Sequence, residues 1–97
     1  MEGRAYCPRG MVIDRLAREK KQVRGAKAIA EFMATRAVEI GVDPKTAKTR
    51  STVSNYLYGD TTPEEDWLTL FALAFELAPE EMGELAYAHS FRALAAA

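Results

Sequence analysis

The sequence has little of what metal sites, disulfides and membrane spans require. Its 97 residues include one cysteine, Cys7, and one histidine, His89. A lone cysteine excludes a disulfide within the chain, and a lone histidine argues against a zinc site. No apolar run approaches the roughly 18 residues of a membrane helix, and the first residues lack the apolar core of a signal peptide. We therefore expect a cytoplasmic protein of one domain, residues 1–97, without metal, cofactor or membrane partner.

Catalytic motifs are missing as well. The chain has no glycine-rich phosphate loop and no metal-ligand spacing. Its candidate nucleophiles are hydroxyl groups and the single thiol near the N-terminus. We therefore expect no enzymatic activity and no small-molecule substrate.

Alternating strand patterns are absent too, and apolar residues recur instead at steps of three and four. The 4 prolines and 6 glycines lie mostly where a helix should begin or end. In "TTPEE" the start signal is clearest, with Thr62 as N-cap, Pro63 at the first helical position and Glu65 completing a capping box. The pattern predicts an all-α fold of five helices on one core, with a loop over 42–48. The helices are expected over about 9–20, 25–40, 50–58, 63–77 and 79–94.

The two halves of the chain carry opposite charge. Residues 1–50 hold 12 Lys and Arg against 6 Asp and Glu, which gives +6. Residues 51–97 hold one arginine against 8 acids, which gives −7. Such segregation indicates a basic face for a polyanion, unless both halves are simply solvated.

The stretch "TRSTVSNYLYG", residues 49–59, predicts a short helix with two different sides. Tyr56 and Leu57 follow Val53 at steps of three and four, so these three side chains can face the core together. The opposite side gathers Arg50, small hydroxyls and Asn55. Small hydroxyls let a backbone approach DNA, asparagine can pair with adenine, and arginine can bind guanine or phosphate. The alternative is a surface helix whose polar side is only hydrated.

Residues 49–82, "TRSTVSNYLYGDTTPEEDWLTLFALAFELAPEEM", resemble the lambda-repressor-like (Cro/Xre-type) helix-turn-helix family. That family has a capped recognition helix of the form S-x-S-T-V-S-x-[YWI], then a glycine and a proline-led helix with an L-x-x-[IL]-A-x-x-L core. A second capped start, P-E-E-L, follows. The matching positions are Thr49, Ser51, Thr52, Val53, Ser54, Tyr56, Gly59, Pro63, Leu68, Phe71, Ala72, Phe75, Pro79, Glu80, Glu81 and Met82. Upstream, Ala37 and Gly41 match the A-x-x-x-G end of the family's second helix.

The resemblance implies a five-helix lambda-repressor-like domain that binds double-stranded DNA in a sequence-specific way. It implies a nucleoid-associated transcriptional regulator of repressor type, such as a phage immunity or Cro-like repressor or an antitoxin that represses its own operon. The chain departs from the family before the recognition helix, where Val53 lies 12 positions after Gly41 and the turn is enlarged. The added "DPKTAK" brings Lys45 and Lys48 beside that helix, to hold a phosphate strand or to form a loop without a DNA contact.

The predicted DNA contacts form two sets. Base readout is assigned to one side of the recognition helix, namely Arg50, Ser51, Thr52, Ser54 and Asn55. Phosphate contacts are assigned to the cations and hydroxyls around it, namely Arg24, Lys27, Lys45, Lys48, Thr49 and Tyr58. The alternative function is a protein-interaction module that kept the fold, does not bind DNA, and uses its acidic half.

The last two predicted helices carry more apolar residues than one core face needs. If the core is filled by Leu68, Phe71, Ala72 and Phe75, a neighbouring apolar stripe stays exposed. Either the last helix covers this stripe within the chain, or two copies meet there. We expect a homodimer, which would set two recognition helices about one DNA turn apart. Its interface is assigned to Trp67, Leu70, Phe91 and Leu94.

Overall fold

The computed structural model describes the backbone of residues 4–96 and the side chains of residues 4–89. Its helices are α1 (Pro8–Lys21), α2 (Gly25–Ile40), the short 3₁₀ helix η1 (Pro44–Ala47), α3 (Arg50–Tyr58), α4 (Glu65–Ala74) and α5 (Pro79–Ala96). No strand occurs in the described backbone, so the predicted all-α class with five α-helices is confirmed. None of the helices described is long and apolar enough to cross a membrane.

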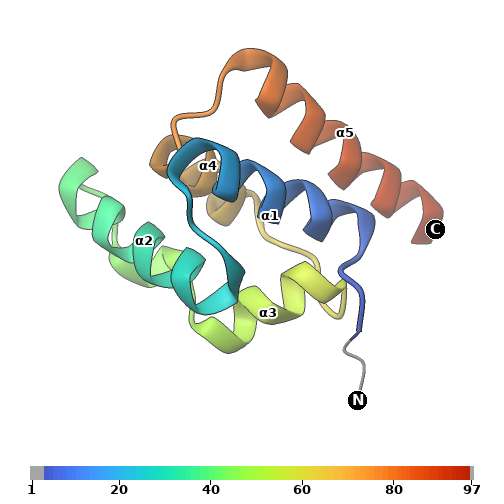
Figure 1. The fold of residues 1–97 in the computed structure, drawn as a ribbon, viewed down its shortest axis with the longest axis horizontal. Helices are drawn as coiled ribbons and strands as arrows, with labels where there is room; N and C mark the ends of the chain where they lie inside the picture. Colours follow the sequence, from blue (N-terminus) through green and yellow to red (C-terminus); the bar gives the residue numbers. More distant parts are fainter. Residues whose placement is uncertain (1–3, 97) are drawn as a thin grey trace.

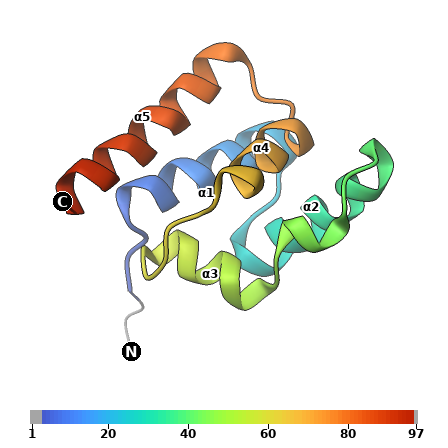
Figure 2. The same cartoon turned by 180° about the vertical axis from the view of Figure 1, so that it is seen from behind.

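Helix α1 lies in the middle of the molecule. It has α5 on one side and α3 on the other, and α2 packs against α3, η1 and α4 (Figure 1). Seen from behind, α5 and α3 again lie along opposite sides of the molecule (Figure 2). The apolar sides of the first four helices meet in one core. Its largest fully buried apolar residues are Ile13, Leu16, Ile29, Met33, Val53, Leu57, Trp67, Leu70, Phe71 and Phe75.

A row of aromatic rings crosses this core. The ring of Tyr56 on α3 meets that of Trp67 on α4, with 5.0 Å between their centroids. Trp67 stacks on Phe71 at 5.5 Å, Phe71 contacts Phe75 at 4.6 Å, and Phe75 contacts Phe32 of α2 at 4.7 Å. Aromatic pairs in such geometry stabilise beyond their buried area, by about 0.5–1.5 kcal/mol each. The row therefore ties α3, α4 and α2 into one packing unit.

The end of α3 docks directly on the start of α1. The backbone N–H of Cys7 donates to the carbonyl of Leu57 at 3.0 Å, and the N–H of Gly10 donates to the Cys7 sulfur at 3.3 Å. A Cβ on Gly10 would lie 1.9 Å from the Leu57 oxygen, so this approach requires glycine. Buried Arg9 adds a hydrogen bond to the carbonyl of Thr61 at 3.2 Å. The position of α3 relative to α1 is therefore fixed by backbone contact.

The segment between α2 and α3 differs from the predicted loop. Helix α2 ends on Gly41, in the left-handed conformation with φ of 83°, and the Asp43 carboxylate then accepts the N–H of Lys45 at 2.9 Å to start η1. Ala47, at the end of η1, is fully buried. Its carbonyl accepts the indole N–H of Trp67 at 3.1 Å. The predicted loop thus contains a helical turn anchored in the core, because a distant tryptophan supplies its hydrogen bond.

Helix α4 begins two residues later than predicted and ends three residues earlier. Glu64 is its N-cap, in extended conformation and without a side-chain capping bond, so the capping box predicted from Thr62 does not form. Pro63 is buried ahead of the helix instead of opening it. The capping carboxylate belongs to the next helix, where the N–H of Ala78 donates to Glu81 at 2.7 Å. Helix α5 begins at Pro79, as predicted.

Two of the predicted dimer residues are wrong, because they are core residues. Trp67 is 0% exposed and Leu70 is 2% exposed, whereas Leu68 and Ala72, which were predicted to fill the core, are half-buried. The helix is turned so that the larger rings enter the core, and the indole finds a buried hydrogen-bond partner. Packing within the chain therefore covers this stripe.

Candidate nucleic-acid interface

Helix α3 is capped at both ends by residues next to it in the chain. The Thr49 hydroxyl accepts the N–H of Thr52 at 3.3 Å and donates to the Thr52 hydroxyl at 3.2 Å. The helix ends at Gly59, which adopts the left-handed conformation with φ of 86° and donates to the Asn55 carbonyl at 3.0 Å. The hydroxyl of Thr49, assigned to a phosphate from the sequence, is thus engaged as a helix cap.

Helix α3 has the buried apolar side and the accessible polar side that the sequence predicts. Val53, Tyr56 and Leu57 are buried, as predicted. The other predicted positions are exposed or half-buried. Exposed are Arg50, Ser51 and Asn55, and half-buried are Thr52, Ser54 and Tyr58. A polar edge of α3 therefore remains accessible to a partner.

A hollow of about 290 Å³ lies between this helix and the first turn of α2. We call it the basic hollow. Its lining residues are Tyr6, Arg24, Gly25, Ala26, Lys27, Arg50, Ser54, Leu57 and Tyr58. The fold thus brings together, around one concave site, five residues that the sequence assigned to DNA contacts.

Most exposed cations elsewhere are neutralised by acids of the same chain. Lys20 pairs with Glu81 at 3.0 Å, and Lys21 pairs with Glu76 at 2.8 Å. These bridges join α1 to the start of α5 and to the segment before it, so much of the charge difference between the two halves is balanced internally. The cations of residues 4–89 with an ion-pair partner are Arg4, Arg15, Arg18, Lys20, Lys21, Arg36 and Lys48.

Four exposed cations have no ion-pair partner among residues 4–89, namely Arg24, Lys27, Lys45 and Arg50. Three of them line the basic hollow. Asp14 accepts the N–H of Gly25, a lining residue, at 3.3 Å and so satisfies one amide at the start of α2. Uncompensated positive charge in a concave site attracts anions.

Aromatic and charged residues form the rim of the basic hollow at the end of α3. The rings of Tyr6 and Tyr58 meet edge to face at 4.9 Å, and the Arg4 guanidinium lies 5.0 Å from the Tyr58 centroid. Arg4 also donates two hydrogen bonds to Asp60, at 2.9 and 2.7 Å, which lower the pKa of that carboxyl. Burial, followed by the charge of Asp14, raises the pKa of Tyr6, so its hydroxyl keeps its proton and can donate.

Sequence reasoning missed Arg4 and Tyr6. Both precede α1 in a stretch without helical periodicity, and only the docking of Cys7 on Leu57 carries them to the end of α3. No local signal pointed to them.

Three predicted phosphate contacts lie outside the basic hollow, namely Lys45, Lys48 and the helix cap Thr49. Lys48 is ion-paired with Glu64, at 3.2 Å, so any anion must compete with that carboxylate. Lys45 is exposed on η1. The predicted interface residues Phe91 and Leu94 have side chains outside the described residues, and the homodimer stays a prediction that now rests on these two.

No family model, curated protein or solved structure matches this chain. The resemblance to the lambda-repressor-like family therefore stays a prediction based on residues 49–82.

Proposed function

We propose that the protein is a sequence-specific, double-stranded DNA-binding transcriptional regulator, of repressor type as the family resemblance implies. One observation carries the proposal. Three of the four exposed cations that lack an ion pair among residues 4–89 gather in the basic hollow, beside a short helix with an exposed polar edge. A merely solvated surface has no reason to concentrate its uncompensated charge there.

The basic hollow is the proposed seat of a DNA backbone phosphate. Arg24 and Lys27 reach it from the start of α2, where the helix dipole adds positive potential. Arg50 and the Ser54 hydroxyl reach it from α3, and the protonated hydroxyl of Tyr6 adds a donor. Contacts of this kind position a protein on the duplex without reading its sequence.

Base readout is proposed for the exposed edge of α3. With a phosphate held in the basic hollow, α3 lies next to the backbone and can enter the major groove. Asn55 is exposed and can bond an adenine edge, while Ser51 permits close approach. The backbone junction of Gly10 with Leu57 gives α3 a rigid support, which a specific contact needs.

The test compares two lysines of equal charge and different surroundings. A duplex selected from a random library is titrated at several salt concentrations, with fluorescence anisotropy as the readout. Lys27→Ala should weaken binding and flatten the log–log salt slope by about one, because one phosphate contact is lost. Lys21→Ala removes the same charge from α1, where the lysine pairs with Glu76, and should leave the slope unchanged.

If both variants had equal effects, the lysines would act only through the overall charge of the protein, and the basic hollow would not be a specific phosphate site. Affinity for duplex DNA that is absent, or independent of salt, would contradict the proposal and favour the alternative of a protein-interaction module. The mass of the complex in solution tests the homodimer separately, since two copies on one pseudo-palindromic site double the bound protein.

A further inference from the structure

Helix α5 stands away from α4 because it is held by α1. It packs along α1, and its acids reach across to that helix. Glu81 pairs with Lys20 at 3.0 Å, and Glu84 pairs with Arg15. The side of α5 that carries these acids is thus occupied, while the next side faces α4 across a gap.

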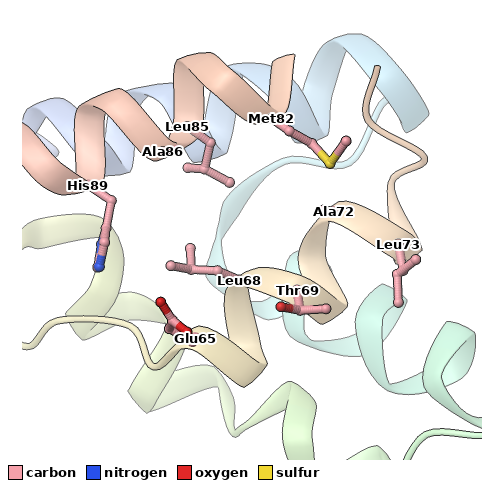
Figure 3. Close-up of a pocket in the computed structure, with 9 residues that line it drawn as sticks. All are labelled: Glu65, Leu68, Thr69, Ala72, Leu73, Met82, Leu85, Ala86 and His89. Carbon is pink, nitrogen blue, oxygen red and sulfur yellow. The ribbon is translucent and has the colours of Figure 1, made fainter. Parts of the chain in front are cut away.

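The gap is an apolar groove, which we call the α4–α5 groove (Figure 3). The two helices run in opposite directions along it, and side chains from both point into it (Figure 3). Glu65 and His89 lie at one end, and Leu73 and Met82 lie at the other (Figure 3). The lining residues are Glu65, Leu68, Thr69, Ala72, Leu73, Met82, Leu85, Ala86 and His89.

The described part of the chain leaves this groove unfilled. Its volume is about 390 Å³, the space of about a dozen water molecules. Leu73 is 52% exposed and Met82 is 44% exposed, although both are large apolar side chains. The Nδ1 atom of His89 is shielded from solvent and makes no hydrogen bond within the described residues. A contiguous apolar surface with a polar atom at its end is typical of a binding groove.

The charge around the α4–α5 groove is negative and uncompensated. Five acids have no ion pair among residues 4–89, and three of these lie in the first turns of the two helices that form the groove. Glu65 and Asp66 open α4 at one end, and Glu80 opens α5 at the other. Two copies meeting face to face through this groove would bring these acids together, which is unfavourable. A cationic partner would instead be attracted from both ends.

We propose that the α4–α5 groove binds an amphipathic helix of another protein, one with an apolar stripe flanked by lysine and arginine. Such a helix places residues i, i+3, i+4 and i+7 in the groove. Its flanking cations can pair with Glu65, which lines the groove, and are attracted over a longer range by Asp66 and Glu80. Helices α5 and α3 lie along opposite sides of the molecule (Figures 1 and 2). A partner between α4 and α5 and a ligand of α3 can therefore bind together.

Two synthetic helical peptides of equal length test the proposal. Both carry leucine at the four stripe positions, and the flanking positions are lysine in one and glutamate in the other. Binding is followed through the ¹³C-methyl signals of Leu73 and Met82. The lysine peptide should shift both signals and bind on the order of tenfold more tightly than the glutamate peptide.

Matched variants separate apolar contact from charge. Leu73→Gln should weaken the lysine peptide on the order of tenfold, whereas Val38→Gln, at a position on α2 that is 65% exposed, should have no effect. The triple change Glu65→Gln, Asp66→Asn and Glu80→Gln should bring the two peptides to similar affinity. Far-UV circular dichroism confirms that each variant is folded.

Three results would overturn the proposal. The first is an absence of methyl shifts at Leu73 and Met82 with either peptide at millimolar concentration. The second is equal affinity of the two peptides for the unaltered protein. The third is a shift of the same methyl signals with protein concentration alone, which would assign the groove to a second copy. None of these bears on duplex binding, which is measured separately.

Discussion

Two glycines inside helices should respond in opposite ways to alanine. A Cβ on Gly10 of α1 would lie 1.9 Å from the carbonyl oxygen of Leu57 and 2.6 Å from its carbonyl carbon. A Cβ on Gly83 of α5 would meet nothing within 4 Å. Both positions are helical, so alanine's better helix propensity acts equally at both, and the difference isolates the contact between α1 and α3.

The expected magnitude follows from the geometry. Ordinary contact begins near 3.4 Å, so Gly10→Ala must separate α1 from the end of α3 by about 1.5 Å, which breaks the 3.0 Å hydrogen bond from Cys7 to Leu57. Overpacking costs about 1–3 kcal/mol and the lost hydrogen bond about 1 kcal/mol, against a gain of about 0.5–1 kcal/mol in helix propensity. The net loss in free energy of unfolding should be about 1–3.5 kcal/mol. Gly83→Ala should instead add about 0.5–1 kcal/mol.

Thermal and urea unfolding, followed by far-UV circular dichroism, measure both variants. A domain of this size shifts its Tm by about 4–8 °C per kcal/mol. Gly10→Ala should therefore lower Tm by about 5–25 °C, and Gly83→Ala should raise it by a few degrees. A shift of the same sign in both variants would refute the reasoning. So would a Gly10→Ala protein within about 0.5 kcal/mol of the parent, because α3 would then not depend on the junction.

Further predictions concern readout, the turn before α3 and pH. Asn55→Ala should cost about 1–3 kcal/mol of binding to the preferred duplex and little on random DNA, and equal losses on both would assign Asn55 to a phosphate. Trp67→Phe leaves the buried Ala47 carbonyl without its donor, so urea unfolding should report a loss of about 1–3 kcal/mol, and an unchanged midpoint would contradict this. The Ala78 N–H, followed by a lysine of α1, lowers the pKa of Glu81. Its charge therefore stabilises the fold above the unfolded pKa of about 4.3, and this stabilisation is lost as the pH falls through the lower folded pKa. In the Glu81→Gln variant, the free energy of unfolding should fall less steeply as the pH is lowered below about 4.3. An equally steep fall would show that the charge of Glu81 does not contribute to stability.

The helices with strong local signals could be predicted closely. Helix α2 was expected to end before Gly41 and α3 before Gly59, and both glycines adopt the left-handed conformation there. The buried side of α3 was also predictable, because Val53 and Leu57 mark it by their spacing. Helix-ending glycines and apolar spacing depend only on residues that are close along the chain, so they can be identified from the sequence alone.

Helix α4 could not be placed from the sequence because distant contacts decide its start and its orientation. Thr62 and Glu65 form an ideal capping pattern, yet Pro63 is buried ahead of the helix and the first turn forms later. The side that turns inward carries Trp67, whose indole needs the carbonyl of Ala47, twenty residues away along the chain. Periodicity gives an apolar helix with several possible buried sides, and this hydrogen bond selects one of them.

The candidate site was predictable in its composition and not in its arrangement. The sequence supplies the cations, but it does not tell which of them an acid will neutralise. Lys48 and Lys27 look equivalent in the sequence, yet Lys48 pairs with Glu64 while Lys27 lies in the basic hollow without an ion pair among the described residues. Arg4 and Tyr6 enter the rim only through the fold.

The turn between α2 and α3 is part of the core and not an addition to the surface. Ala47 is fully buried, and its carbonyl holds Trp67, whose ring contacts Tyr56 on α3 at 5.0 Å. The turn, α4 and α3 therefore share one packing unit, and α3 is supported from this side as well as from its junction with α1. A turn of this length is compatible with a fixed α3 because Pro44–Ala47 form η1 and bind the core, so that α3 is not held by a flexible tether. Lys45 belongs to η1, and its backbone N–H is bonded to the Asp43 carboxylate. Its backbone therefore has a fixed place in the turn that leads into α3.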